Sequence, residues 1–567
     1  MRRTLIVFVL VGLGGVWYAI LPPRLTPALP AGQGVPRAVR GAIHVHTDRS
    51  DGTGRVDDIA AAAARAGLDF LVLTDHGDAA REPDAPRYRG GVLCIDAVEI
   101  STSNGHVLAV GLPAAPYPLG GEGRDVVDDI QRLGGVAIAA HPGSTKPELQ
   151  WSDWSVPVDG LEWLNGDSQW RDESAWSMAR ALFTYPVRAT ETLAGLLDRP
   201  DAVLRQWDVL TRERRVVAVA GADAHARLSL RSLGEPYDNG ASFHVPSYEQ
   251  MFRLFANTLP DAQFTGDAAA DAQAVLAALR GGHVYSVVDA VAGAATISFT
   301  GTNGKTHVTG GDAIPLAGPV TLRVELQQGP PDARIDLVKD GAMAATGTGS
   351  TLEHVAGVAA PGVYRVEVSR PGAPGQPPMP WMVSNPIYVG RHAASTAPRA
   401  APRRPSAVAV QYADGPATRW QIETSSASRA ALDVVQATKG SELALRYALG
   451  GAASASPFAA FVMTAGEDLP TYDRLVFTAR ADRPMRISVQ LREPAGQLGE
   501  RWHRSIVLDT APRHVTIVFD DLRAIGTTTR ERPTLGRIDS ILFVVDTVNT
   551  PLGGSGRIWI DDVSYAR

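Results

Sequence analysis

The feature that most constrains this chain is a change in its hydrophobic pattern near residue 290. From Gly41 to Asp289, short β-branched or leucine-rich runs alternate with alanine- and leucine-rich stretches of helical character. This alternation is typical of an α/β domain with a largely parallel sheet. The pattern predicts helices at 56–66, 126–133, 175–183, 202–214, 248–259 and 268–279, and buried strands at 42–45, 70–74, 93–100, 107–110, 136–140, 160–164 and 216–220.

Beyond residue 290 the pattern becomes one of alternating strands separated by Gly/Pro turns. Residues 290–390 are expected to form a small β-sandwich. An Ala/Pro-rich linker follows at 391–406, and residues 407–567 show the regular strand spacing of a jelly-roll sandwich. A chain of 567 residues is too long for one hydrophobic core, so several domains are expected.

The N-terminus carries Arg2 and Arg3 followed by an apolar run from Leu5 to Leu21. Such a segment, here assigned to residues 1–24, is typical of a signal peptide or a membrane anchor. The protein is therefore expected to be exported, to the periplasm or the extracellular space, and either secreted or anchored in a membrane by this segment.

Charge and cysteine content exclude several classes of protein. The net charge of -6 and the absence of a long Lys/Arg run argue against general nucleic-acid binding. The single cysteine, Cys94, is interpreted as a small buried hydrophobic residue, and it rules out intramolecular disulfides and cysteine-rich zinc sites.

Six of the thirteen histidines fall in the first region beside strand-like runs, namely His44, His46, His76, His106, His141 and His225. Asp51, Glu99 and Asp223 lie near the same strand ends. Parallel strands gather their active sites at their carboxyl ends, and buried charges need partners. Imidazoles and carboxylates without a thiolate suit Zn, Mn or Fe, and nine such groups exceed what one ion can use. Two or three divalent ions are therefore expected, with Glu99 placed to bridge them.

These motifs resemble the polymerase and histidinol phosphatase (PHP) family of metal-dependent phosphoesterases. The resemblance runs from about Ala42 to Asp289 and rests on His-x-His-Thr followed by Ser-Asp-Gly, Leu-Thr-Asp-His, Ala-His-Pro-Gly and Ala-Asp-Ala-His. It implies a distorted (β/α)7 barrel over residues 41–289, within an α/β chain that ends in two all-β sandwich domains. It also implies a trinuclear site in which all nine residues are ligands, with Asp75 orienting an imidazole.

Clustered cations lower the pKa of a bound water and neutralise phosphoryl oxygens, so the expected activity is hydrolysis of a phosphate mono- or diester by a metal-bound hydroxide. His225 or His141 could protonate the leaving oxygen. Lys146 and Arg227, just beyond two ligand-bearing strand ends, are candidates to hold the phosphate of a small substrate. The segment from Ser144 to Arg215, which contains Trp170, is the expected site of substrate selection.

The last region resembles the galactose-binding-like jelly rolls of carbohydrate-binding modules, through Tyr472 to Leu475, Arg501-Trp502 and Trp559 to Val563. This resemblance implies a glycan partner. Trp420 and Trp502 could stack on a sugar ring, although a role in the sandwich core is favoured.

Two other functions fit parts of the sequence. Metal-dependent amidohydrolases also open with His-x-His and close with an Asp, but they bridge their metals with a modified lysine, and no lysine precedes Lys146 here. Alternatively, an inert barrel could be carried by a cell-surface protein that binds glycans.

Overall fold

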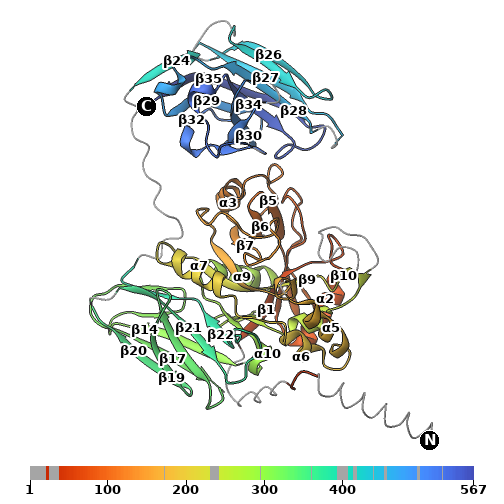
Figure 1. Cartoon of the computed structure of the whole chain (residues 1–567), viewed down its shortest axis with the longest axis vertical. Coiled ribbons are helices and arrows are strands. Elements are labelled where there is room, and N and C mark those ends of the chain that lie inside the picture. Colours follow the sequence, from red (N-terminus) through yellow and green to blue (C-terminus); the bar gives the residue numbers. More distant parts are fainter. Residues whose placement is uncertain are drawn as a thin grey trace, which may run out of the picture. The chain divides into compact units, whose positions relative to one another are not determined.

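The computed structural model describes residues 21–24, 38–171, 173–229, 242–293, 295–327, 329–358, 361–391, 407–412, 418–437, 440–452, 456–494, 499–526 and 528–567 (Figure 1). The chain divides into two compact units. The first comprises Met1–Asp78, Glu82–Pro113 and Glu122–Pro398, and the second comprises Ala79–Arg81, Ala114–Gly121 and Arg399–Arg567.

The first unit begins with a sheet whose strands supply the candidate site. These strands are β1 (Val39–Val45), β2 (Phe70–Leu73), β3 (Arg87–Arg89), β4 (Val92–Asp96), β5 (Val98–Thr102), β6 (Gly105–Val110), β7 (Val136–Ala139), β8 (Gly160–Asn165), β9 (Val217–Ala224), β12 (Ala256–Leu259) and β13 (Tyr285–Val287). The short strands β10 (Leu228–Ser229) and β11 (Ser242–Phe243) form a separate two-stranded sheet.

Helices accompany only some of these strands. They are α2 (Val56–Ala66), α3 (Gly123–Arg132), α4 (Ser168–Arg171), α5 (Ala175–Thr184), α6 (Ala189–Ala194), α7 (Asp201–Thr211), α8 (Tyr248–Phe252), α9 (Ala268–Gly281) and α10 (Asp289–Ala292). The buried side chains of β1, β2, β4, β7 and β9 pack with Ala272, Val275 and Leu279 of α9 in one hydrophobic cluster. This core fixes the strands whose ends carry the site.

The predicted fold class, an α/β chain built on a distorted (β/α)7 barrel, is wrong. Strands hold 40% of the residues and helices 17%, so the described chain is mostly β, with several β-sandwich sheets. The sheet that contains β1 closes on itself, yet β4, β5 and β6 follow one another without a helix. β5, β6 and β7 pair antiparallel, and β13 continues the sheet antiparallel to β22 (Met382–Ser384). The sequence pattern therefore overestimated parallel pairing in this sheet.

One predicted helix, 248–259, is helical only in α8, because the chain then turns into strand β12. β12 pairs antiparallel with β1, and Val39 lies opposite Leu259. The Asn257 side chain also hydrogen-bonds both the N–H and the C=O of Ala220, at 2.9 and 2.7 Å. Pairing with the rest of the sheet therefore overrides the local helical periodicity.

Residues 296–389 add two more groups of strands. A four-stranded sheet has the order β15-β14-β17-β20, while β19, β18, β21, β22 and β23 extend the sheet of the first region. Their bounds are β14 (Thr296–Thr302), β15 (His307–Thr309), β16 (Ala313–Ile314), β17 (Val320–Gln327), β18 (Arg334–Lys339), β19 (Ala342–Thr348), β20 (Thr351–Ala356), β21 (Gly362–Ser369) and β23 (Ile387–Val389).

The second unit is a sandwich of two antiparallel sheets, drawn in cyan to blue in Figure 1. One has the order β26-β27-β35-β29-β32, with β24 beside β35, and the other β25-β28-β34-β30-β31-β33. Trp420 and Trp502 are buried, which confirms the core role favoured for both over sugar stacking. The bounds are β24 (Val408–Tyr412), β25 (Trp420–Thr424), β26 (Arg429–Gln436), β27 (Ser441–Ala448), β28 (Phe458–Thr464), β29 (Arg474–Ala481), β30 (Met485–Arg492), β31 (Arg501–Leu508), β32 (Arg513–Val518), β33 (Arg523–Ala524), β34 (Ser540–Asp546) and β35 (Ser555–Ala566).

Two predictions concern segments that are largely or wholly outside the described residues. Of the predicted export segment only residues 21–24 are described, and of the predicted linker only residue 391. Among the residues that are described, no helix combines the length and the apolar character needed to cross a membrane. Cys94 is buried and not in a disulfide, as expected, and burial raises the pKa of its thiol to about 11.

Candidate metal centre

The site begins where β1 ends. The pairing of β1 with both β2 and β9 shifts register between Ile43 and Val45, so His44 sits in a bulge with φ of 67°. His44 and His46 are both fully buried, with ring centroids 5.1 Å apart. Strand alternation predicted that the two imidazoles share one site, and the structure brings them together around this bulge.

Two further ligand candidates also have left-handed backbone. His141, just after β7, has φ of 30°, and Asp223, in β9, has φ of 48°. Such conformations cost on the order of 1–3 kcal/mol for a residue other than glycine and concentrate at functional sites. The backbone at these three positions is therefore strained where the candidate side chains converge.

Glu99 lies at the centre of the cluster. Its Oε1 is 2.8 Å from both His106 Nδ1 and His141 Nε2. Its Oε2 lies 3.1 Å from His44 Nε2 and 3.2 Å from His46 Nε2. Burial alone would raise the pKa of Glu99, but the imidazoles of the cluster lower it well below its ordinary value. The two oxygens thus face different sets of imidazoles, as a bridging carboxylate requires.

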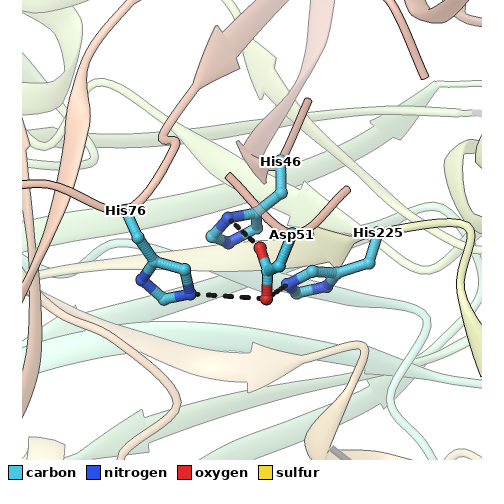
Figure 2. Close-up of side chains that lie close together, drawn as sticks. All are labelled: His46, Asp51, His76 and His225. Atoms are coloured by element: carbon cyan, nitrogen blue, oxygen red, sulfur yellow. Dashed lines mark ion pairs between the residues drawn. The ribbon is translucent and has the colours of Figure 1, made fainter. Parts of the chain in front are cut away.

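Asp51 forms a second centre, shown in Figure 2 between three imidazoles. Its Oδ1 lies 3.3 Å from His46 Nδ1, and its Oδ2 lies 3.6 Å from His76 Nε2 and 3.2 Å from His225 Nε2. The His225 ring stacks on His46 at 4.1 Å. Despite burial, these imidazoles hold the pKa of the Asp51 carboxyl well below its usual range.

Asp223 completes the cluster from β9, with its Oδ1 3.3 Å from His44 Nε2 and 3.6 Å from His46 Nε2. Burial would raise the pKa of Asp223 and lower those of His44 and His46, but the opposite charges prevail and shift each pKa the other way. All nine predicted ligands therefore meet in space. Their donor atoms form overlapping groups within 4.8 Å: His46, Asp51, His76 and His225; His44, Glu99 and His141; His44, His46 and Asp223; and His76, Glu99 and His106.

Glu162, which lies in the fully buried strand β8, was not among the predicted site residues. Its Oε1 is 2.7 Å from His44 Nδ1, and its Oε2 accepts hydrogen bonds from the His141 N–H at 2.7 Å and from Asn165 Nδ2 at 2.8 Å. This carboxylate fixes the His44 ring so that Nε2 faces Glu99. The sequence could have indicated Glu162, because it lies inside a run predicted to be a buried strand, where a charged group requires a partner.

Tyr248, at the start of α8, was also missed. Its hydroxyl donates to the His46 carbonyl at 2.8 Å and accepts from the N–H groups of Thr53 and Gly54 at 3.1 Å. It therefore ties the segment that carries His46 to the turn that follows Asp51. Burial raises the pKa of Tyr248 to about 12, so the phenol keeps its proton near neutral pH.

Asp75, predicted to orient an imidazole, instead supports a turn. Its carboxylate accepts hydrogen bonds from the Thr47 N–H, the Thr47 hydroxyl and the Ser50 hydroxyl, each at 2.7 Å. Asp75 therefore holds the turn that comes directly before Asp51.

The two predicted phosphate-holding residues differ in position. Arg227 Nη1 lies 3.5 Å from the Asp51 carbonyl oxygen, beside the cluster. Lys146 is half-buried in the turn after His141, where its N–H donates to Ser144 Oγ at 3.3 Å.

A pocket of about 840 Å³, including its open mouth, adjoins the cluster. Asp223, His225 and Arg227 line it, together with side chains from α4, α5 and α6. These helices belong to the segment Ser144 to Arg215, where substrate selection was expected. Because His225 is the most exposed imidazole of the cluster, with 20% of its side chain accessible, the cluster is open toward this pocket.

The comparisons with known proteins reach only the C-terminal part of the chain. No protein family and no curated protein matches the sequence. Among solved structures, a family 11 carbohydrate-binding module from Clostridium thermocellum, in complex with a β-1,3-1,4-mixed-linked tetrasaccharide, is 15% identical, with 28% of this chain and 94% of that chain covered and a TM-score of 0.24. A family 30 carbohydrate-binding module of a cellulosomal cellulase from the same organism is 12% identical, with 28% and 96% covered and a TM-score of 0.22.

These similarities are too low to assign a ligand to the C-terminal part. None of the comparisons supports the predicted relation to PHP phosphoesterases.

Proposed function

We propose that the first unit is a metal-dependent hydrolase that cleaves phosphate mono- or diesters. The observation that carries this proposal is the convergence of six imidazoles and three carboxylates into overlapping groups within 4.8 Å. Mixed imidazole and carboxylate donors without thiolate favour Zn, Mn or Fe over softer metals. Because one imidazole nitrogen binds one ion and Glu99 can bridge, the overlapping groups fit two or three ions.

The state of the buried donors supports this fit. His46 Nε2 is buried and has no hydrogen-bond partner among the described residues. It lies near two carboxylates, 3.2 Å from Glu99 and 3.6 Å from Asp223. A cation held between this nitrogen and the two carboxylates would give the nitrogen a partner.

When bound, divalent ions supply a nucleophilic water near neutral pH and neutralise charge on phosphoryl oxygens. The protein's own residues then orient the substrate. The Arg227 guanidinium, which lines the pocket with Asp223 and His225, is placed to pair with an anionic oxygen. His225, the most accessible imidazole, is placed to deliver a proton to the leaving oxygen, and His141 is the buried alternative. The motif resemblance to PHP phosphoesterases supports the same chemistry.

An amidohydrolase is the closest rival, since it would use similar ligands. Amidohydrolases bridge their metals with a modified lysine, but no lysine precedes Lys146 in this sequence. Here Glu99 lies in the bridging position, which favours a phosphoesterase. The other alternative is an inert unit carried by a glycan-binding protein. It is disfavoured because core packing alone does not require the left-handed backbone found at His44, His141 and Asp223.

Metal analysis of the purified protein tests the proposal first, and two or three equivalents of Zn, Mn or Fe are expected. Hydrolysis of p-nitrophenyl phosphate and of its diester should then fall at least 100-fold in Glu99→Gln and in Asp223→Asn, because each removes a negative donor. Exposed carboxylates on the same unit provide matched controls, Glu148→Gln and Asp58→Asn. Unchanged hydrolysis in both cluster variants would overturn the proposal. So would a protein that holds no stoichiometric metal after incubation with an excess of these ions.

A further inference from the structure

The pocket beside the cluster is lined mainly by apolar side chains. Met178, Leu182, Leu193, Leu196, Met251 and Leu254 face it, and Trp170 and Tyr185 contribute aromatic rings. The polar residues of the lining include Asp223 in β9 and His225 and Arg227, which follow this strand. A hollow of this kind holds an apolar body while a few polar groups fix one end of the ligand.

Helix α5 carries this apolar character from the pocket to the surface. Leu182 lines the pocket, yet the residue is 58% exposed, so it stands at the mouth. The same helix exposes Trp176 at 77% and Phe183 at 67%. Large apolar side chains grouped on an exposed helix commonly mark a binding surface. An apolar substituent could thus extend from the cluster along α5.

We infer that the ester cleaved at the cluster carries an apolar alkyl or aryl group, and that this group occupies the pocket between α4, α5 and α6. The inference rests on the proposed function, since it assigns the substrate class of the same site. Hydrolysis breaks the P–O bond, water supplies the hydroxyl that remains on phosphorus, and the alcohol leaves with a proton. The pocket would hold that alcohol.

The test is calorimetric binding of methyl-, butyl- and octylphosphonic acid to the full-length protein, in metal-loaded and metal-depleted forms. Each methylene that enters the pocket should tighten binding about fourfold, the ratio that burial of one CH2 group produces. Octylphosphonic acid should therefore bind far more tightly than the methyl compound in both forms. Equal affinity along the series would overturn the inference.

Two pairs of variants locate the effect. Ala181→Phe fills the pocket and should reduce octyl binding at least tenfold without changing methyl binding, whereas Ala179→Phe, on the same helix but outside the pocket lining, should change neither. Leu182→Lys, at the exposed mouth, should also weaken octyl binding more than its neighbour Phe183→Lys. An unaltered octyl preference in both Ala181→Phe and Leu182→Lys would contradict the assignment.

The substrate could be a soluble amphiphile or a lipid in a bilayer, and two arms separate these sources. One supplies monomeric octyl phosphate, and the other supplies phosphatidylcholine vesicles that contain about one-tenth phosphatidic acid. Hydrolysis in either arm, faster than that of methyl phosphate, supports the inference and identifies the source. If chain-length-dependent binding persists while no ester is cleaved, the pocket assignment stands and only the hydrolase proposal fails.

Discussion

Glu162 provides the sharpest test of how the candidate metal centre is held. Its carboxylate contacts His44 Nδ1, the His141 N–H and Asn165 Nδ2 at 2.7–2.8 Å, so one side chain orients two of the nine donors. Glu162→Gln keeps the shape but removes the charge that fixes the His44 ring. Loss of such a supporting partner typically weakens metal binding 10–100-fold, and we expect a change of this size.

The assay is metal titration of the chelator-treated protein with a competing fluorescent indicator. Circular dichroism should show an unchanged fold, and Glu148→Gln provides an exposed control. Esterase activity at saturating metal should recover in Glu162→Gln but not in Glu99→Gln, since Glu162 acts through His44. Metal affinity within twofold of the native value would refute the role assigned to Glu162.

Three further predictions concern stability. Gly221→Ala should lower both stability and metal content, because an added Cβ would lie 1.8 Å from Glu162 Oε1; Gly318→Ala, with open space around it, is the control for a thermal melt and metal analysis. Arg365→Met should cost about 3–5 kcal/mol in urea unfolding, because it leaves the buried carboxylate of Asp208 without its guanidinium partner and Glu367 with Arg199 alone. Thermal melts of the chelator-treated protein should be highest between about pH 4 and 6.5. The pKa values of Asp51, Glu99 and Asp223 are lowered in the folded protein, so the stability that these carboxylates give is lost as pH falls below about 4. The pKa values of His44, His46 and His141 are raised, so the stability that these imidazoles give is lost as pH rises above about 6.5.

The sequence predicted the site better than the fold class. The signal for the site is local, since each ligand-type residue lies within or close to a short hydrophobic run. For this reason the nine residues could be named from the strand pattern together with the resemblance to PHP phosphoesterases. Helix α2, predicted at 56–66, is found at Val56–Ala66 for a similar local reason.

The predictions that failed depend on pairing between distant segments. The run 93–100 splits into β4 and β5, and β5 turns back antiparallel onto β6. The run 248–259 changes from helix to strand because β1 and β13 offer hydrogen-bond partners to β12. Periodicity within a segment carries no information about such partners, so parallel pairing was overestimated.

The metal proposal does not depend on the fold class that was predicted with it. What it requires is that His44, His141 and Asp223 hold left-handed backbone and that the side chains of Glu99 and Glu162 lie in a buried space. Each of these features is unfavourable by itself, by about 1–3 kcal/mol for the backbone alone. Carboxylates and imidazoles can neutralise one another without metal, but a relaxed backbone would serve that purpose equally well. The strain at these three donors is explained if their atoms must converge on shared ions. Loss of metal should therefore increase the mobility of these backbone segments before the hydrophobic core unfolds.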